Sequence, residues 1–205
     1  MLIALILATG AVALGLAREG SLEALAATPL RGVWLLFCGL GLQLTASLWS
    51  PPWLTRPWAL LVIVLSNLAI VVFIAVNRLL PGMLLADLGV ALNLLVIVAN
   101  GAMPVSPGAA RLAGIESTPG ALALRHQEMT AETALPWLGD IIPMPGLREV
   151  LSVGDLLLAA GIAFLVYART MAVAEIGDAG ASPSRGVRSR GASGSPPAAR
   201  PAPRP

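Results

Sequence analysis

The sequence predicts an all-α, polytopic membrane protein with about five transmembrane helices and a structured loop between helices four and five. Two features of composition support this class: 57% of the 205 residues are hydrophobic, and the mean hydropathy is +0.82. Only 12% of the residues are charged, whereas a soluble domain carries about 25%. The third observation is the arrangement of apolar segments along the chain, which are long and separated by arginine, proline and glycine.

A transmembrane helix needs about 20 predominantly apolar residues, within a range of about 17 to 25. Five segments come close to this length: 2–17, 32–49, 58–76, 83–99 and 152–171. The first has no positively charged start, and its end, GLAREG, is a poor site for signal-peptide cleavage. We therefore expect it to be a retained span.

The arginines predict the orientation, because short cytoplasmic loops carry an excess of positive charge. With the N-terminus outside and the C-terminus in the cytoplasm, Arg18, Arg31, Arg78 and Arg169 are cytoplasmic. The loop of residues 100–151 is then external and contains more acidic than basic side chains. The sequence therefore predicts a multi-pass protein of the cell membrane with this orientation.

The chain divides into a membrane domain, residues 1–176, and a tail, residues 177–205. The tail consists largely of Gly, Ala, Ser, Pro and Arg, a composition that cannot bury a core and predicts disorder. The net charge of +2 comes from tail arginines, so it indicates no basic face for nucleic acid. The expected partner is the lipid bilayer.

The loop of residues 100–151 is too long for a simple connection, because loops beyond about 15 residues are usually functional or disordered. It contains the motifs NGAMPVSP and LPWLGDIIPMP, rich in turn-fixing proline and glycine. We expect both motifs to pack on the bundle. Thr118 followed by Pro119 also predicts the start of a short helix over residues 119–135.

Four polar residues fall within the predicted spans. Gln43, Asn67 and Asn93 favour hydrogen bonds between helices, because polar groups in lipid usually face the bundle. Asp87 lies about one turn inside its helix, where it can snorkel to the interface or cap the helix. One acid is too few for the proton or ion pathway of a transporter, and no internal repeat is visible.

Two acids close to the last span leave two interpretations open. Asp140 follows the first half of LPWLGDIIPMP, and Asp155 stands within SVGDLLLAAG at the start of the span. Two carboxyls that share one proton can activate water as a catalytic dyad. Alternatively, the spacing S-x-x-D is a capping box, with Ser152 as the structural cap and Asp155 bonding back to it. Capping boxes far outnumber dyads, so the cap is favoured.

Three motifs in order, NGAMPVSP, LPWLGDIIPMP and SVGDLLLAAG, together with AREGSLEALA, resemble an uncharacterised bacterial integral-membrane family known only as domain of unknown function 5317. The resemblance covers most of residues 1–171. It implies a polytopic membrane protein without an established activity. Within the first motif, Asn100, Gly101 and Pro104 are the candidate binding residues.

A second, partial resemblance is to lipoprotein signal peptidase, a membrane aspartic peptidase. Asn100-Gly101 is similar to its asparagine–glycine motif, and Asp140 and Asp155 are similar to its catalytic pair. Ser152 departs from that family, which has asparagine there, and its G-N-x-x-D-R stretch is missing. The family also places two spans between its first and second motifs, and this chain places none.

These observations lead to two hypotheses for function. The first is a non-enzymatic protein that binds or assembles a partner, such as a membrane protein or a lipoprotein. The alternative is a membrane aspartate-dyad peptidase or hydrolase with its site on the external face. No HExxH or phosphate loop is present, and Cys38 is the single cysteine, so we expect neither metal nor cofactor. His126, the single histidine, is expected to be solvated on a helix.

Overall fold

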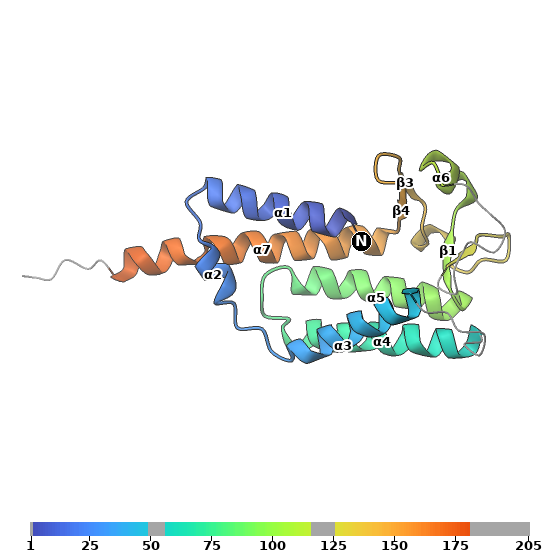
Figure 1. Cartoon of the computed structure of the whole chain (residues 1–205), viewed down its shortest axis with the longest axis horizontal. Coiled ribbons are helices and arrows are strands. Elements are labelled where there is room, and N and C mark those ends of the chain that lie inside the picture. Colours follow the sequence, from blue (N-terminus) through green and yellow to red (C-terminus); the bar gives the residue numbers. More distant parts are fainter. Residues whose placement is uncertain (1, 49–55, 116–125, 181–205) are drawn as a thin grey trace, which may run out of the picture.

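The computed structural model describes residues 2–48, 56–115 and 126–180. Five apolar helices make up most of it (Figure 1). They are α1 (Leu2–Ala17), α3 (Val33–Leu48), α4 (Arg56–Val76), α5 (Met83–Asn100) and α7 (Val153–Gly180). A short helix, α2 (Leu22–Ala26), follows α1, and Ser21 caps it by accepting a hydrogen bond from the backbone N of Glu23.

The five helices coincide closely with the five predicted segments. Three are long and apolar enough to cross a membrane, over Pro57–Val76, Met83–Asn100 and Val153–Ala172. The other two, at Leu2–Ala17 and Val33–Thr45, are shorter apolar helices. α7 continues to Gly180, so the first four residues assigned to the tail are helical. The rest of the predicted tail lies outside the described residues.

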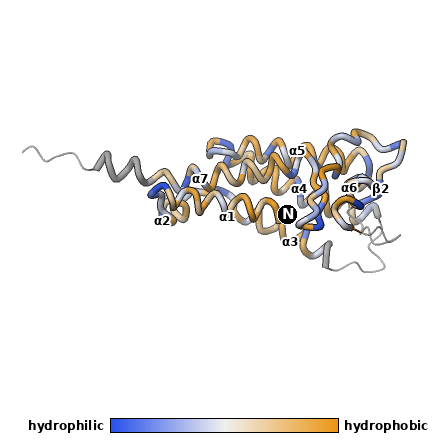
Figure 2. The backbone as a smooth tube through the Cα atoms, turned by 90° about the horizontal axis from the view of Figure 1, so that it is seen from above, coloured by the Kyte–Doolittle hydropathy of each residue, from blue (hydrophilic) through white to orange (hydrophobic). Residues whose placement is uncertain are grey.

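The helices pack in the order α1–α7–α5–α4–α3, which is not the order of the sequence. Helices α7, α5 and α4 lie side by side, and α1 and α3 are added at the two ends on the same side (Figures 1 and 2). Within the described residues, α1 and α3 do not form a packed pair with each other. The bundle is therefore an open arc instead of a closed ring.

Glycines allow the central pair of helices, α5 and α7, to approach closely. A methyl group at Gly89 would collide with the backbone of Gly154, and one at Gly82 would collide with the backbone of Gly161. Small residues at such positions let helices pack backbone to backbone, which is a common basis of association in lipid. This seam packs the first three turns of α7 against the first half of α5.

The segment between α5 and α7 contains short elements that the all-α prediction did not include. They are β1 (Met103–Val105), α6 (Pro107–Leu112), β2 (His126–Glu128), the 3-10 helix η1 (Pro136–Leu138), β3 (Ile142–Met144) and β4 (Glu149–Leu151). β1 and β2 pair in parallel, with Met103 opposite His126, and β3 and β4 form an antiparallel hairpin.

The predicted helix over residues 119–135 is corrected by this pairing. Residues 116–125 lie outside the described part, and residues 126–128 form strand β2 instead. The edge of β1 is available for pairing. Residues 126–128 form their backbone hydrogen bonds with this edge instead of within a helix. The helix of this loop is α6, where Ser106 caps the backbone N of Ala109 and Pro107 occupies the first turn.

Both loop motifs pack against one end of the bundle, which we call the loop end. Residues 102–105 of NGAMPVSP are buried, and Met103 joins a hydrophobic cluster with Ile63, Val96 and Ile97. Polar residues gather at this end and around α2 at the other, while the helices between them are apolar (Figure 2). The loop is therefore a folded cover on the bundle.

Candidate functional site

A cavity of about 480 Å³ lies at the loop end, between the helices and the folded loop. Side chains from all five long helices line it, together with residues of β1, β2, α6 and the β3–β4 hairpin. Its volume falls within the range of about 300–1,000 Å³ that is typical of ligand sites. Asp140 and Asp155 both line this cavity, so the fold brings the two predicted acids to one place.

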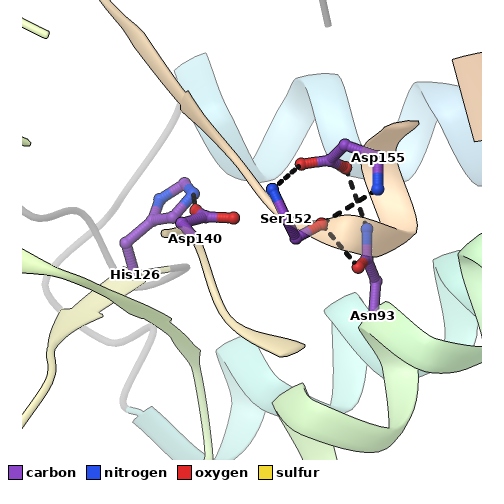
Figure 3. Close-up of polar contacts among 5 residues, drawn as sticks. All are labelled: Asn93, His126, Asp140, Ser152 and Asp155. Carbon is purple, nitrogen blue, oxygen red and sulfur yellow. Dashed lines mark hydrogen bonds and ion pairs between the residues drawn. The ribbon is translucent and has the colours of Figure 1, made fainter. Parts of the chain in front are cut away.

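Asp155 is fixed by a polar network at the start of α7 (Figure 3). Its backbone N donates to Ser152 Oγ at 2.9 Å, and its Oδ2 accepts from the backbone N of Ser152 at 3.1 Å. This reciprocal pattern is a capping box. Its Oδ1 accepts from Asn93 Nδ2 at 2.9 Å, and Ser152 Oγ donates to Asn93 Oδ1 at 2.8 Å. Both carboxylate oxygens of Asp155 therefore have a donor from the protein.

Asp140 is held by its backbone instead. Its backbone N donates to the carbonyl of Pro104 at 2.8 Å, and its own carbonyl accepts from Ser106 N at 2.9 Å. It forms an isolated parallel bridge with Val105, on the strand that also pairs with β2. These contacts place the side chain beneath the loop, where only 5% of the residue is exposed.

The side chain of Asp140 has a different partner from that of Asp155. Its nearest charged contact is between Oδ2 and Nε2 of His126, at 3.8 Å, and the His126 side chain is 42% exposed. Its other oxygen is turned toward Ser152 at the start of α7 (Figure 3). Burial, and then the negative charge of Asp155, raise the pKa of Asp140 to about 8. The carboxyl is thus mostly protonated at neutral pH.

The pair consists of a proton-bearing acid and a fixed carboxylate that face one cavity. The two carboxyls share no hydrogen bond within the described residues, because the donors to Asp155 are Ser152 and Asn93. The protonated Asp140 carboxyl can donate a hydrogen bond to a ligand. Alternatively, the two carboxyls can bind a cation between them. Among the described residues, no three His, Cys, Asp or Glu side chains are placed to hold a metal ion.

The three candidate binding residues lie outside the cavity lining and organise the loop. Asn100 Nδ2 donates to the carbonyls of Val96 and Ala134, and its Oδ1 accepts from Ala134 N. Gly101 ends α5 with a φ of 78°, in the left-handed region that favours glycine. Pro104 is buried, and its carbonyl holds Asp140. A direct binding role for these three residues stays a prediction.

Asn93 makes the interhelical hydrogen bonds that the sequence predicted, and its partners are Ser152 and Asp155. Asn67 instead donates within its own helix, to the carbonyl of Ile63. Asp87 lies in α5 toward the opposite end of the bundle, outside the cavity lining.

The sequence interpretation missed His126, because strand β2 places it next to Asp140 instead of on a solvated helix. It also missed Arg148 and Glu149 in the cavity wall. No local motif marks these residues. A signal for the hairpin was present, because Pro143 and Pro145 stiffen the segment that precedes the return of the chain toward Asp155.

The comparisons with known proteins give one result. Residues 27–167 match the family described as "Family of unknown function (DUF5317)". Neither the curated proteins nor the solved structures give a match. The partial resemblance to lipoprotein signal peptidase therefore receives no support.

Proposed function

The chain belongs to DUF5317, a family of unknown function, and we propose that it is a multi-pass membrane protein that binds a ligand or partner group in the loop-end cavity without catalysing a reaction. The apolar helices associate it with the membrane. The cavity gives it a concave site with a few convergent polar groups, which is the usual form of a binding site. The protein would use this cavity to bind or assemble its partner.

One observation carries the proposal. The Asp140 carboxyl is buried, lines a cavity of about 480 Å³ and has its ion-pair contact, His126 Nε2, at 3.8 Å. A buried polar group that is incompletely paired costs up to about 1–3 kcal/mol. A bound molecule that gives the Asp140 carboxyl a closer donor would recover part of this free energy. Asp155, by contrast, is already saturated by Asn93 and Ser152.

The retention of a ligand during purification tests the proposal. In Ala4→Trp the indole would enter the cavity, because Ala4 lines it from α1. Leu5→Trp is the matched control, because Leu5 is 65% exposed on the same helix and does not line the cavity. Mass spectrometry of extracts should find a small molecule retained by the wild type and by Leu5→Trp, and depleted at least fivefold in Ala4→Trp. Equal extracts from all three proteins would contradict the proposal.

A second candidate is a membrane hydrolase that uses Asp140 and Asp155 as an aspartate dyad. Its support is that both acids line one cavity and that the charge of Asp155 helps to raise the pKa of Asp140. Such separation of two carboxyls into a proton donor and an acceptor suits acid–base chemistry. The retained molecule discriminates the two functions. A hydrolase would convert it to products, and either Asp140→Asn or Asp155→Asn alone would abolish conversion. A binding protein would return it unchanged.

We further propose that all five apolar helices span the membrane, with the N-terminus outside and the C-terminus in the cytoplasm. The arginine distribution supports this orientation. A reporter fused after Arg185 should give a cytoplasmic signal, and one inserted at Gly114 should give an external signal. The same signal from both sites would contradict a five-span topology.

A further inference from the structure

We propose that the loop-end cavity takes a membrane amphiphile with a primary ammonium headgroup, which enters sideways between α1 and α3 and places its ammonium between Asp140 and Asp155. This inference rests on the proposed binding function and adds the chemical class of the ligand. It is carried by the route into the cavity, by the change in its lining with depth and by its charge.

The route follows from the open arc of helices. The cavity is lined by Ile3 and Ala4 of α1 and by Gln43 of α3, the two helices at the ends of the arc. These two helices lie on the same side of the bundle, and their described residues do not form a packed pair (Figures 1 and 2). In a bilayer, the space between them faces lipid. An amphiphile can therefore reach the cavity without leaving the membrane.

The lining changes along the axis of the bundle. Asp140, Asp155 and the β3–β4 hairpin form the wall at the loop. Ile63 and Ile97, which cluster with Met103, line the cavity near the loop as well, and about one turn deeper than Asn93 and Asp155 the wall is formed by Val90 and Leu158. Val90 lies ten positions before the end of α5, or about 15 Å at a rise of about 1.5 Å per residue. The cavity thus reaches about halfway into a hydrocarbon core of about 30 Å.

The polar side chains of this deeper wall already have partners. Asn93 is bonded to Ser152 and Asp155, and Asn67 donates to the carbonyl of Ile63. The deeper part of the cavity is thus suited to an acyl or alkyl chain. The polar end of the ligand belongs at the loop, next to the acids.

The charge of the site favours a cation as this polar end. Four carboxyl groups line the cavity, those of Glu128, Asp140, Glu149 and Asp155. The facing cations are Arg148, which donates to the carbonyl of Gly114, His126, which is half-exposed at 3.8 Å from Asp140, and the N-terminal ammonium of the chain, whose charge lowers the pKa of Asp140 in part. Asp155 has neutral donors, namely the Asn93 amide and a backbone N–H. An ammonium group supplies three N–H donors and a positive charge, so it can donate to the Asp140 carboxyl while its charge lies beside Asp155.

Binding would displace the proton of Asp140. Because the pKa of this group is raised to about 8 by burial and by Asp155, an incoming ammonium competes with a proton below that pH. The amine itself stays charged, since alkylammonium groups resemble lysine with a pKa near 10.4. Apparent affinity should therefore fall by about tenfold for each pH unit below 8, because one proton is released on binding.

The experiment compares matched probes on the full-length protein in detergent or nanodiscs. Hexadecylamine, hexadecanol and palmitate share a chain and differ in the headgroup, and native mass spectrometry or calorimetry measures their affinities. We expect hexadecylamine to bind at least tenfold more tightly than the other two at pH 8, and to lose affinity as the pH is lowered. Asp140→Asn should remove both the preference and the pH dependence. Equal binding of the three probes, or an unchanged amine preference in Asp140→Asn, would overturn the inference.

Two further variants keep the test decisive if Asp140→Asn fails to fold. Ala4→Trp should weaken all three probes by at least tenfold, and Leu5→Trp should leave them unchanged. If Ala4→Trp binds every probe as the wild type does, the cavity is not a binding site and the proposed function also fails. If Ala4→Trp weakens binding but the wild type shows no amine preference, only the ammonium assignment fails. A further comparison, of phosphatidylethanolamine with phosphatidylcholine, separates a lipid source from a free amine. Tighter binding of phosphatidylethanolamine would indicate a lipid headgroup as the source of the ammonium.

Discussion

The start of α7 and the Gly139–Ile141 segment both present an aspartate to the same cavity, but they hold it in different ways. At the start of α7, Asp155 accepts hydrogen bonds at both oxygens and its position is fixed by its own helix and by Asn93. In the loop segment, the backbone of Asp140 is fixed, and the carboxyl has an ion-pair contact with His126 at 3.8 Å. The first acid therefore has a structural explanation within the chain. The carboxyl of Asp140 is held less closely, and this contrast points to Asp140 as the position that a ligand completes.

The largest expected effect that tests this contrast is the pH dependence of stability. The pKa of Asp140 is raised to about 8 in the folded protein, whereas an unfolded aspartate has a pKa near 3.9. Between these values the folded state binds one more proton than the unfolded state. The free energy of unfolding should therefore fall as the pH rises from about 4 to 8, by up to about 1.4 kcal/mol per unit, and level off above pH 8.

Thermal unfolding of the detergent-solubilised protein measures this slope. Asp140→Asn keeps the shape and removes the titrating group, so its profile should lose this component. At pH 8 the variant should equal or exceed the wild type in stability. A profile for Asp140→Asn that matches the wild type would show that Asp140 titrates normally.

The next effect concerns the capping network. Ser152→Ala removes the acceptor for Asp155 N and the donor to Asn93 Oδ1. Loss of an N-cap costs about 0.5–2 kcal/mol, and we expect a value in the upper half of this range because Asn93 also loses a partner. Ser152→Thr, which keeps the hydroxyl, should recover most of the loss. Chemical denaturation measures both, and a neutral Ser152→Ala would mean that the capping box adds nothing.

A smaller effect should connect the two acids. Asp155→Asn removes the negative charge that contributes to the raised pKa of Asp140, so the pKa of Asp140 should move down toward its ordinary value. Burial is the larger cause and is unchanged, so the shift should be partial. The carboxyl band of Asp140 in infrared difference spectra reports its protonation directly. An unchanged midpoint would indicate that the two groups do not interact.

The smallest effect is expected for an exposed acid in the same loop. Glu132 is exposed and does not line the cavity. Glu132→Gln removes one charge, as Asp140→Asn does, and should change stability by less than about 0.5 kcal/mol. It should leave probe binding and its pH dependence unchanged. A large effect here would mean that net loop charge, instead of the buried position of Asp140, explains the behaviour of the site.

The features that follow from local sequence were predictable. The five apolar segments predicted the five helices closely. Apolar composition marks each segment, and prolines and glycines separate the segments, and both are local signals. The capping pattern of Ser152 and Asp155 was predictable for the same reason, since its hydrogen bonds join residues three positions apart. Asn93 was expected to bond across helices, but its partner could not be named before α5 and α7 were packed.

The sequence by itself determined the helices, the capping box and a folded loop of unusual length. The tertiary structure decided the packing order of the helices and the burial of Asp140. The pairing of residues 103–105 with residues 126–128 placed His126 beside Asp140, in a region where the sequence had predicted a helix. These contacts join residues far apart in the chain, so no local propensity records them. The pKa of Asp140 follows from them, because desolvation and the charge of Asp155 act only after the loop has closed over the bundle.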